Sequence, residues 1–256
     1  MKTFIALLSL SVLGVVTTSV AAPKPDLRCF EMRTYYANSN KLDELQARFR
    51  DHTLKLFEKH GMVNIGYWTP LENSENKLIY ILAYPDRLAR ETSWKDFSAD
   101  PAWREVVKQS EANGRLVRKV DSLFLTATDF SPHVQATNHA PARVFELRTY
   151  TATPDRLPNL LARFREHTLA LFKKHGMTSF GYWTPSDMAQ GADNTLVYIL
   201  AHPSPEAAAE NFKNFRADPA WVAAKKASED KGGGPLTIPD GVKSVFMAPT
   251  DYSPTK

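Results

Sequence analysis

Hydrophobic and polar positions alternate along residues 29–36, and this period of two predicts a β-strand with one apolar and one polar face. Glu31, Arg33 and Tyr35 share the polar face. The spacing then becomes helical over residues 42–56, where the apolar positions form a stripe about 100° wide. Gly61 follows this segment and is typical of a helix C-terminus.

Three more strands and a second helical region complete the pattern. Strands are predicted over residues 62–69, 78–84 and 120–126. Asp100-Pro101 predicts the start of a helix, because aspartate caps helices and proline suits the first helical position. The order β-α-β-β-α-β is the ferredoxin-like arrangement of an α+β fold.

The chain then repeats this pattern. Residues 48–62 match residues 163–177 at 12 of 15 positions, and Gly-Tyr-Trp-Thr-Pro occurs at 66–70 and again at 181–185. A period this long suits one small domain per copy rather than a solenoid. We predict a first repeat at residues 28–130, a linker at 131–142 and a second repeat at 143–253.

A four-stranded sheet with helices on one side leaves its other face uncovered. Two such sheets on one chain can cover each other, so we predict a closed or nearly closed α/β barrel within the monomer. We expect the polar strand face, with Glu31, Arg33 and Tyr35, to line its centre.

The N-terminus has the three parts of a secretory signal peptide. Lys2 is followed by an apolar run over residues 4–16 and by the small residues Ser19-Val20-Ala21. The alternative is a membrane anchor, but the run is shorter than the roughly 20 residues that cross a bilayer. We expect residues 1–21 to be removed and the protein to be periplasmic or secreted.

Composition narrows the classes of function. Cys29 is the single cysteine, so an internal disulfide is excluded. The net charge of +4 is mild and no basic face with interleaved aromatics is visible, which does not support nucleic-acid binding. Glycine-rich phosphate loops, Cys-x-x-Cys pairs, serine nucleophile elbows and His-Glu-x-x-His helices are missing from the sequence. We therefore predict no metal and no cofactor.

Four segments, each present in both copies, together resemble the NIPSNAP family of the dimeric α/β-barrel superfamily. They are Phe-Glu-x-Arg-Thr-Tyr, the Arg-Phe-x-x-His-Thr helix, Gly-Tyr-Trp and Asp-Pro-Ala-Trp. The resemblance covers nearly the whole mature chain and implies tandem ferredoxin-like repeats in a barrel. It implies no settled catalytic activity. Relatives in the wider superfamily include cofactor-free monooxygenases, isomerases and haem enzymes, so the fold does not choose the reaction.

Two histidines are candidate catalytic residues. His52 and His167 fall within the predicted apolar stripe of their helices, where a histidine could act as a general base or a ligand. The alternative is a core histidine whose ring nitrogens bond to neighbouring strands.

Charged strand residues form a second candidate set. They are Glu31, Arg33 and Tyr35 in the first copy, and Glu146, Arg148 and Tyr150 in the second. If buried, these charges must be paired or hydrogen-bonded. They could bind a polar or anionic ligand, or they could form a structural ion-pair network.

Adjacent aromatic residues form a third candidate set, Tyr67 with Trp68 and Tyr182 with Trp183. Successive strand residues point to opposite faces, so one member of each pair should line the central space. Such a wall suits an apolar or planar ligand, and the alternative is core filling.

The leading hypothesis is an exported protein that binds a small, partly apolar molecule in its barrel. An alternative is a cofactor-independent monooxygenase or isomerase, with His52 or His167 as base and Arg33 or Arg148 stabilising an enolate-like anion. Whether the protein is an enzyme stays open.

A third hypothesis is an assembly module whose barrel is filled by side chains and which acts through protein contacts. Homo-oligomers through the outer helix faces are a further expectation. Leu54 and Leu169 suggest such contacts, because they lie opposite the predicted apolar stripe in both copies. Differences between the copies indicate where they diverge: Tyr84 is replaced by His202, and residues 232–234 predict an extended mobile loop.

Overall fold

The computed structural model describes residues 25–256, and the predicted signal peptide lies outside them. The first half contains β1 (Cys29–Ala37), α1 (Leu42–Arg48), a π-helical turn η1 (Phe49–Thr53), α2 (Leu54–Lys59), β2 (Val63–Pro70), β3 (Lys77–Tyr84), α3 (Arg87–Ala99), α4 (Pro101–Ser110) and β4 (Val117–Ala127). The second half contains β5 (Val144–Ala152), α5 (Leu157–Arg163), η2 (Phe164–Thr168), α6 (Leu169–Lys174), β6 (Thr178–Pro185), the short η3 (Met188–Gln190), β7 (Thr195–His202), α7 (Pro205–Ala217), α8 (Pro219–Gly232) and β8 (Thr237–Pro249). Both halves follow the predicted ferredoxin-like order.

An aspartate caps the last helix of each half. The carboxylate of Asp100 accepts a hydrogen bond from the backbone N–H of Ala102 at 2.9 Å, as the Asp-Pro pair predicts. Asp218 does the same for α8, with the N–H of Ala220 at 2.9 Å. Among residues 25–256, no helix is both long enough and apolar enough to cross a membrane.

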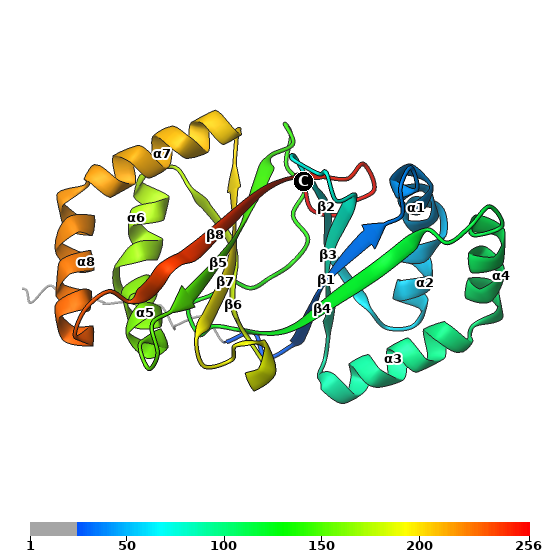
Figure 1. Ribbon diagram of the computed structural model, residues 1–256, viewed down its shortest axis with the longest axis horizontal. Coiled ribbons are helices and arrows are strands. Elements are labelled where there is room, and N and C mark those ends of the chain that lie inside the picture. Colours follow the sequence, from blue (N-terminus) through cyan, green and yellow to red (C-terminus); the bar gives the residue numbers. More distant parts are fainter. Residues whose placement is uncertain (1–24) are drawn as a thin grey trace, which may run out of the picture.

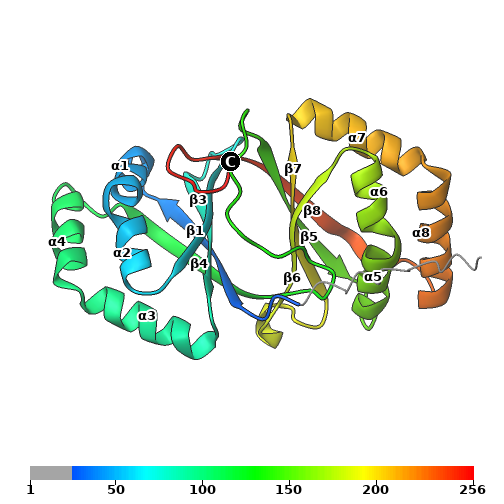
Figure 2. The same ribbon diagram turned by 180° about the vertical axis from the view of Figure 1, so that it is seen from behind.

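The two sheets join into one closed barrel with the strand order β1-β3-β2-β8-β5-β7-β6-β4. Within each half all neighbours are antiparallel. Two short seams close the barrel: β2 pairs with β8 from Trp68↔Pro249 to Pro70↔Met247, and β4 pairs with β6 from Leu125↔Pro185 to Ala127↔Trp183. The helices lie on the outer side of each sheet, α1–α4 at one end of the molecule and α5–α8 at the other (Figures 1 and 2). The predicted intramolecular barrel is confirmed.

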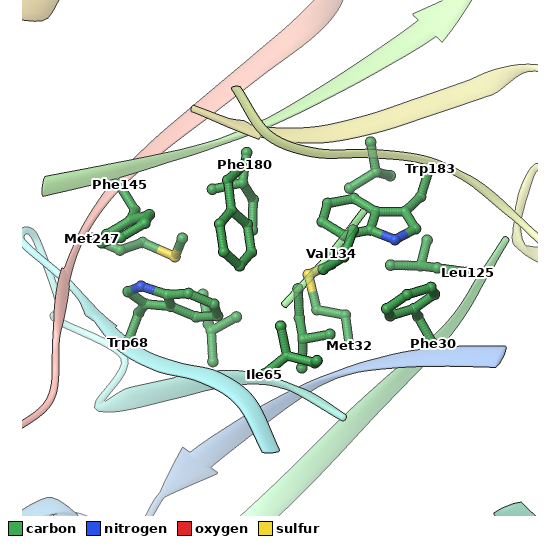
Figure 3. Close-up of a cluster of buried hydrophobic side chains, with 14 of the residues drawn as sticks. Phe30, Met32, Ile65, Trp68, Leu125, Val134, Phe145, Phe180, Trp183 and Met247 are labelled. Carbon is green, nitrogen blue, oxygen red and sulfur yellow. The ribbon is translucent and has the colours of Figure 1, made fainter. Parts of the chain in front are cut away.

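Apolar side chains fill the space between the sheets (Figure 3). Phe30 and Met32 point into this space, whereas Glu31, Arg33 and Tyr35 point outward against the helices. The expectation that the polar strand face lines the barrel was wrong. Two facing sheets can exclude water only if their shared face is apolar, and the charged face finds partners on α3 and β4 instead.

The tryptophans of the Gly-Tyr-Trp segments lie inside the barrel, and the tyrosines face the helices. Trp68 and Trp183 are fully buried. Each indole lies against the glycine two residues earlier. A Cβ at Gly66 would be 2.3 Å from the ring of Trp68, and a Cβ at Gly181 would be 2.3 Å from that of Trp183. The barrel centre is thus a packed core. This matches the core-filling alternative for the two tryptophans rather than an aromatic wall around a ligand.

A π-helical turn in each half moves the predicted histidines to the surface. In the first half the backbone N–H of Leu54 bonds to the carbonyl of Phe49, five residues back. The wider turn places Thr53 rather than His52 in line with Phe49 and Phe57, and His52 is exposed. His167 in η2 has an exposed side-chain fraction of 47 %. Their expected place in the apolar stripe was wrong.

The same turn brings the two leucines inward. Leu54 and Leu169 are partly buried, although helical spacing predicted that they face away. Each packs against the helix-side core of its half, the apolar cluster between the helices and the outer face of the sheet. The outer helix faces therefore lose the apolar residues on which an oligomer contact was expected.

The glycines at 232–234 end a helix rather than forming an extended loop. Helix α8 continues to Gly232, and Gly233 adopts the left-handed conformation with φ 75°. The backbone N–H of Gly234 donates to the carbonyl of Glu229 at 2.8 Å, and Arg156 donates to the carbonyl of Gly233 at 2.9 Å. These bonds tie the segment to the start of α5.

Candidate functional site

A fully buried carboxylate organises the outer face of the first sheet. Glu31 on β1 accepts two hydrogen bonds from Arg90 of α3, at 2.8 and 2.9 Å. Ser122 of β4 donates at 2.6 Å, and Tyr84 and Trp94 each donate at 3.2 Å. Together with Arg33 these donors satisfy both carboxylate oxygens.

The donors hold Glu31 in its ionised form. Burial alone raises the pKa of Glu31, but the Arg90 hydrogen bonds, the charge of Arg33 and the Ser122 hydroxyl outweigh it and bring the pKa down to about 2. The indole of Trp94 lies over the guanidinium of Arg33, 4.3 Å from ring centre to Cζ. The predicted Glu/Arg pair is therefore part of a closed network in this half.

The second half keeps the carboxylate and loses three of its donors, one of them through the exchange of Trp94 for Phe212. Arg148 and Ser244 still donate to Oε1 of Glu146. Ala208 stands where the first half has Arg90, and His202 stands where it has Tyr84. Nε2 of His202 lies 3.3 Å from Oε2 of Glu146 without the alignment of a hydrogen bond.

Several buried polar atoms around Glu146 consequently have no hydrogen-bond partner within residues 25–256. They are Glu146 Oε2, Arg148 Nε, Tyr198 Oη and both ring nitrogens of His202. Burial raises the pKa of Glu146, but His202, Arg148 and Ser244 outweigh it and leave the pKa below its ordinary value. Such orphaned groups are costly in a protein interior, and sites that bind ligands tolerate them.

A pocket of about 430 Å³ opens beside these groups in the second half. Its floor is the outer face of β5 and β8, and its walls come from η2, α6, α7 and α8. Aromatic rings and cationic side chains dominate the lining: Phe164, Phe172, Phe212, Phe215, Trp221, Arg148, Arg163, Arg216 and Lys225. Tyr150 and a single acid, Glu229, also line it.

The predicted residues divide among three places. Arg148 and Tyr150 line this pocket, and Glu146 lies behind Arg148. Tyr67 and Tyr182 are buried in the helix-side cores, and Trp68 and Trp183 lie inside the barrel.

The two predicted histidines line other grooves. His52 borders a groove of about 340 Å³ between η1 and α4, and His167 borders one of about 120 Å³ between η2 and α8. His167 and Arg148 line different pockets, so the structure does not bring the proposed base and anion stabiliser together.

Sequence reasoning missed the arginine and aromatic residues that distinguish the pocket. Arg163 belongs to the repeated Arg-Phe-x-x-His segment, but its role depends on how Glu229 lies across from it. Phe212 and Trp221 were not among the predicted residues, because aromatic side chains are common in helix cores. Within the described residues, no group of three or more His, Cys, Asp or Glu side chains could hold a metal ion.

Comparison with protein families decides the classification. The NIPSNAP family model matches residues 30–132 and again residues 145–254. The chain belongs to the NIPSNAP family. Its two NIPSNAP copies correspond to the two halves of the barrel. No curated protein matches the chain.

Solved structures share the fold at low sequence identity. A "putative monooxygenase" from Fusobacterium nucleatum is 11 % identical, with a TM-score of 0.56 over 87 % of this chain and 92 % of that one. An anthrone oxidase-like protein is 9 % identical, with a TM-score of 0.56 over 88 % and 92 %. A NIPSNAP domain protein from Burkholderia xenovorans is 25 % identical, with a TM-score of 0.36 over 41 % of this chain and 98 % of its own. The first two likenesses extend over both NIPSNAP copies and support the barrel.

Proposed function

We propose that this NIPSNAP protein binds a small, partly apolar molecule in the helix-side pocket of its second half. The observation that carries the proposal is the pocket itself, about 430 Å³ in volume and walled by aromatic rings. Ligand pockets for small molecules have volumes of roughly 300–1,000 Å³ and mostly apolar walls with a few polar groups. The barrel centre is a poorer candidate, because tryptophan, phenylalanine and methionine side chains pack it.

The first half offers a natural comparison for this pocket. Trp94 occupies the position of Phe212, and its indole N–H donates to Tyr84 at 2.8 Å while its ring covers Arg33. Because an indole is larger than a phenyl ring, we infer that Trp94 takes up space that Phe212 leaves open. The two copies have therefore diverged where a ligand would lie.

Ring size at this position provides the test. Wild-type protein is screened against a library of small aromatic compounds by thermal shift, and hits are measured by isothermal titration calorimetry. Phe212→Trp should weaken binding about tenfold or more, because it gives the second half the ring of the first. Trp94→Phe, the reverse exchange in the first half, should leave binding unchanged. The proposal fails if no compound raises the melting temperature, or if both exchanges leave affinity intact.

The names of the two structural neighbours suggest oxygenase chemistry for those proteins. For this chain, the helix histidines and Arg148 line different pockets, which removes the arrangement that such a mechanism would need. We therefore propose binding and assign no catalytic step.

We also propose that the protein is exported, on the basis of the charged, apolar and small-residue segments of residues 1–21. Intact-mass measurement of protein expressed from the full gene in a bacterial host tests this. Export predicts a mature chain that begins at Ala22 and is found in the periplasm or medium, whereas an uncleaved chain in the cytoplasm contradicts it.

A further inference from the structure

The helix-side pocket contains an arginine that lacks the partner its counterpart has. In the first half, Nη1 of Arg48 donates to Glu111 at 3.0 Å and lies 3.4 Å from the hydroxyl of Ser110. In the second half, Nη1 of Arg163 is 3.7 Å from Glu229 and makes no hydrogen bond. The side chain of Arg163 is only 6 % exposed, so it is largely removed from bulk solvent.

The burial of Arg163 and its electrostatic surroundings also indicate a guanidinium that is incompletely paired. Burial lowers the pKa of Arg163 below its ordinary value even though Glu229 attracts the charge. Its Nε and Nη1 are both without a hydrogen-bond partner within the described chain, and its guanidinium lies 5.2 Å from the ring centre of Trp221. Arg48 shares an unpartnered Nε, so Nη1 marks the difference between the halves.

Arg148 shows a second difference of the same kind. In the first half, Nε of Arg33 donates to the hydroxyl of Tyr80 at 3.1 Å. In the second half, Nε of Arg148 and the hydroxyl of Tyr198 are both unpartnered within residues 25–256. Arg148 is 14 % exposed and lines the pocket. Two arginines that line one pocket thus carry N–H groups without a hydrogen-bond partner within the described residues.

The pocket also carries excess positive charge. Its lining contains four cationic side chains, those of Arg148, Arg163, Arg216 and Lys225, and one carboxylate, that of Glu229. The first half has Ser98 in place of Arg216 and Val107 in place of Lys225. At these two positions the second half has cations where the first half has neutral side chains.

We propose that the ligand of this pocket is an organic anion, with a carboxylate bound by Arg148 and Arg163 and a planar apolar body against Phe212, Phe215 and Trp221. Arginine binds carboxylates through parallel N–H bonds, and such bonds are strongest where water is excluded. Offset or edge contacts with aromatic rings then fix the flat body. The proposal rests on the proposed function, because it names the class of molecule that the same pocket takes.

Three probes with one ring system and different head groups test the charge. They are 2-naphthoate, 2-naphthamide and 2-naphthylmethylamine, titrated into the mature protein by calorimetry. Naphthoate should bind with one molecule per chain and at least about tenfold more tightly than the amide, because only the carboxylate pairs with arginine. The amine should bind most weakly of the three.

Matched variants then locate the head group. Arg163→Gln should weaken naphthoate binding about tenfold or more and leave naphthamide binding nearly unchanged. Arg48→Gln, the same exchange in the first half, should leave both unchanged. The double variant Arg216→Ser with Lys225→Val gives the second half the first-half residues at two exposed positions, and should weaken naphthoate binding several-fold. If Arg163→Gln does not fold, this double variant tests whether the positive charge of the pocket selects the carboxylate.

The outcomes separate the two proposals. If the amide or the amine binds as tightly as naphthoate, the pocket binds small molecules but the ligand is not selected by negative charge, and this inference fails alone. If Arg48→Gln weakens naphthoate binding as much as Arg163→Gln, the carboxylate is not bound specifically in the second half, and this inference fails. If none of the three probes binds and the aromatic library gives no hit, the proposed function fails as well.

Discussion

Replacing Arg90 by alanine is the most direct test of how the first half is stabilised. The change imitates the second half, where Ala208 occupies this position. It removes two hydrogen bonds to Glu31, at 2.8 and 2.9 Å, and leaves four donors, which are Arg33, Ser122, Tyr84 and Trp94. A fully buried carboxylate then keeps its charge with fewer partners.

The size of the effect follows from the pKa of Glu31. Its ordinary value is 4.5 and the folded protein lowers it to about 2. At roughly 1.4 kcal/mol per unit, the network contributes about 3 kcal/mol at pH 7. Arg90 supplies its largest favourable part but is itself 15 % exposed and desolvated. We expect Arg90→Ala to lower the free energy of unfolding by about 2 kcal/mol, below the cost of breaking a fully buried pair.

The dependence on pH gives a second measure. A carboxylate whose folded pKa lies below its unfolded value stabilises fully above the unfolded value, here 4.5, and loses that contribution as pH falls through the folded value, here about 2. The difference between wild type and Arg90→Ala should therefore be largest at neutral pH and shrink towards pH 2.

Urea denaturation followed by circular dichroism at pH 7, 4 and 3 measures both quantities. Lys95→Ala serves as control, because Lys95 is an exposed residue on the same helix. The reasoning is refuted if Arg90→Ala costs no more than Lys95→Ala, or if its cost stays constant as the pH falls.

Two further changes test other parts of the fold. Gly66→Ala and Gly181→Ala should each lower the free energy of unfolding by about 1–3 kcal/mol, because the new Cβ lies 2.3 Å from the indole two residues later. Denaturant titration measures this loss. An unchanged free energy of unfolding would mean that the indole has room to move. Asp218→Asn should lower the melting temperature at pH 7, because the hydrogen bonds from Lys174, His175 and the N–H of Ala220 hold the pKa of Asp218 well below its usual range. That stabilisation is present above the ordinary value of 3.8 and lost at lower pH, so scanning calorimetry should find wild type and variant converging on acidification, and a constant gap would contradict it.

The repeat, the element order and the closed barrel were all predictable from sequence. Strand alternation, the Asp-Pro cap and the duplicated segments are local signals, and two open sheets on one chain have a natural way to cover each other. The orientation of the sheets was not predictable in this way. Glu31 and Arg33 looked suited to a central cavity, because the sequence does not show that Arg90 and Ser122 bind Glu31. These two partners of Glu31 lie 59 and 91 residues further along the chain.

The site was only partly predictable. Arg148 and Tyr150 were identified from the strand pattern, but a π-helical turn displaced His52 and His167 from the face that ideal helical spacing gives them. The exchange of Tyr84 for His202 was visible in the sequence as a difference between the copies. The effect of that exchange depends on Ala208, which stands where the first half has Arg90. Only the three-dimensional structure shows that Arg90 binds the carboxylate of Glu31.

The seams of the barrel also constrain the order of events during synthesis. Trp68 pairs with Pro249 and Pro70 with Met247, so the outer edge of β2 cannot be paired until residues 247–249 have been made. Until then, the edge of β2 and the apolar face around Phe30 and Met32 are open to other chains. The newly made first half therefore stays prone to aggregation until β8, in the second half of the same chain, has been made and covers the edge of β2.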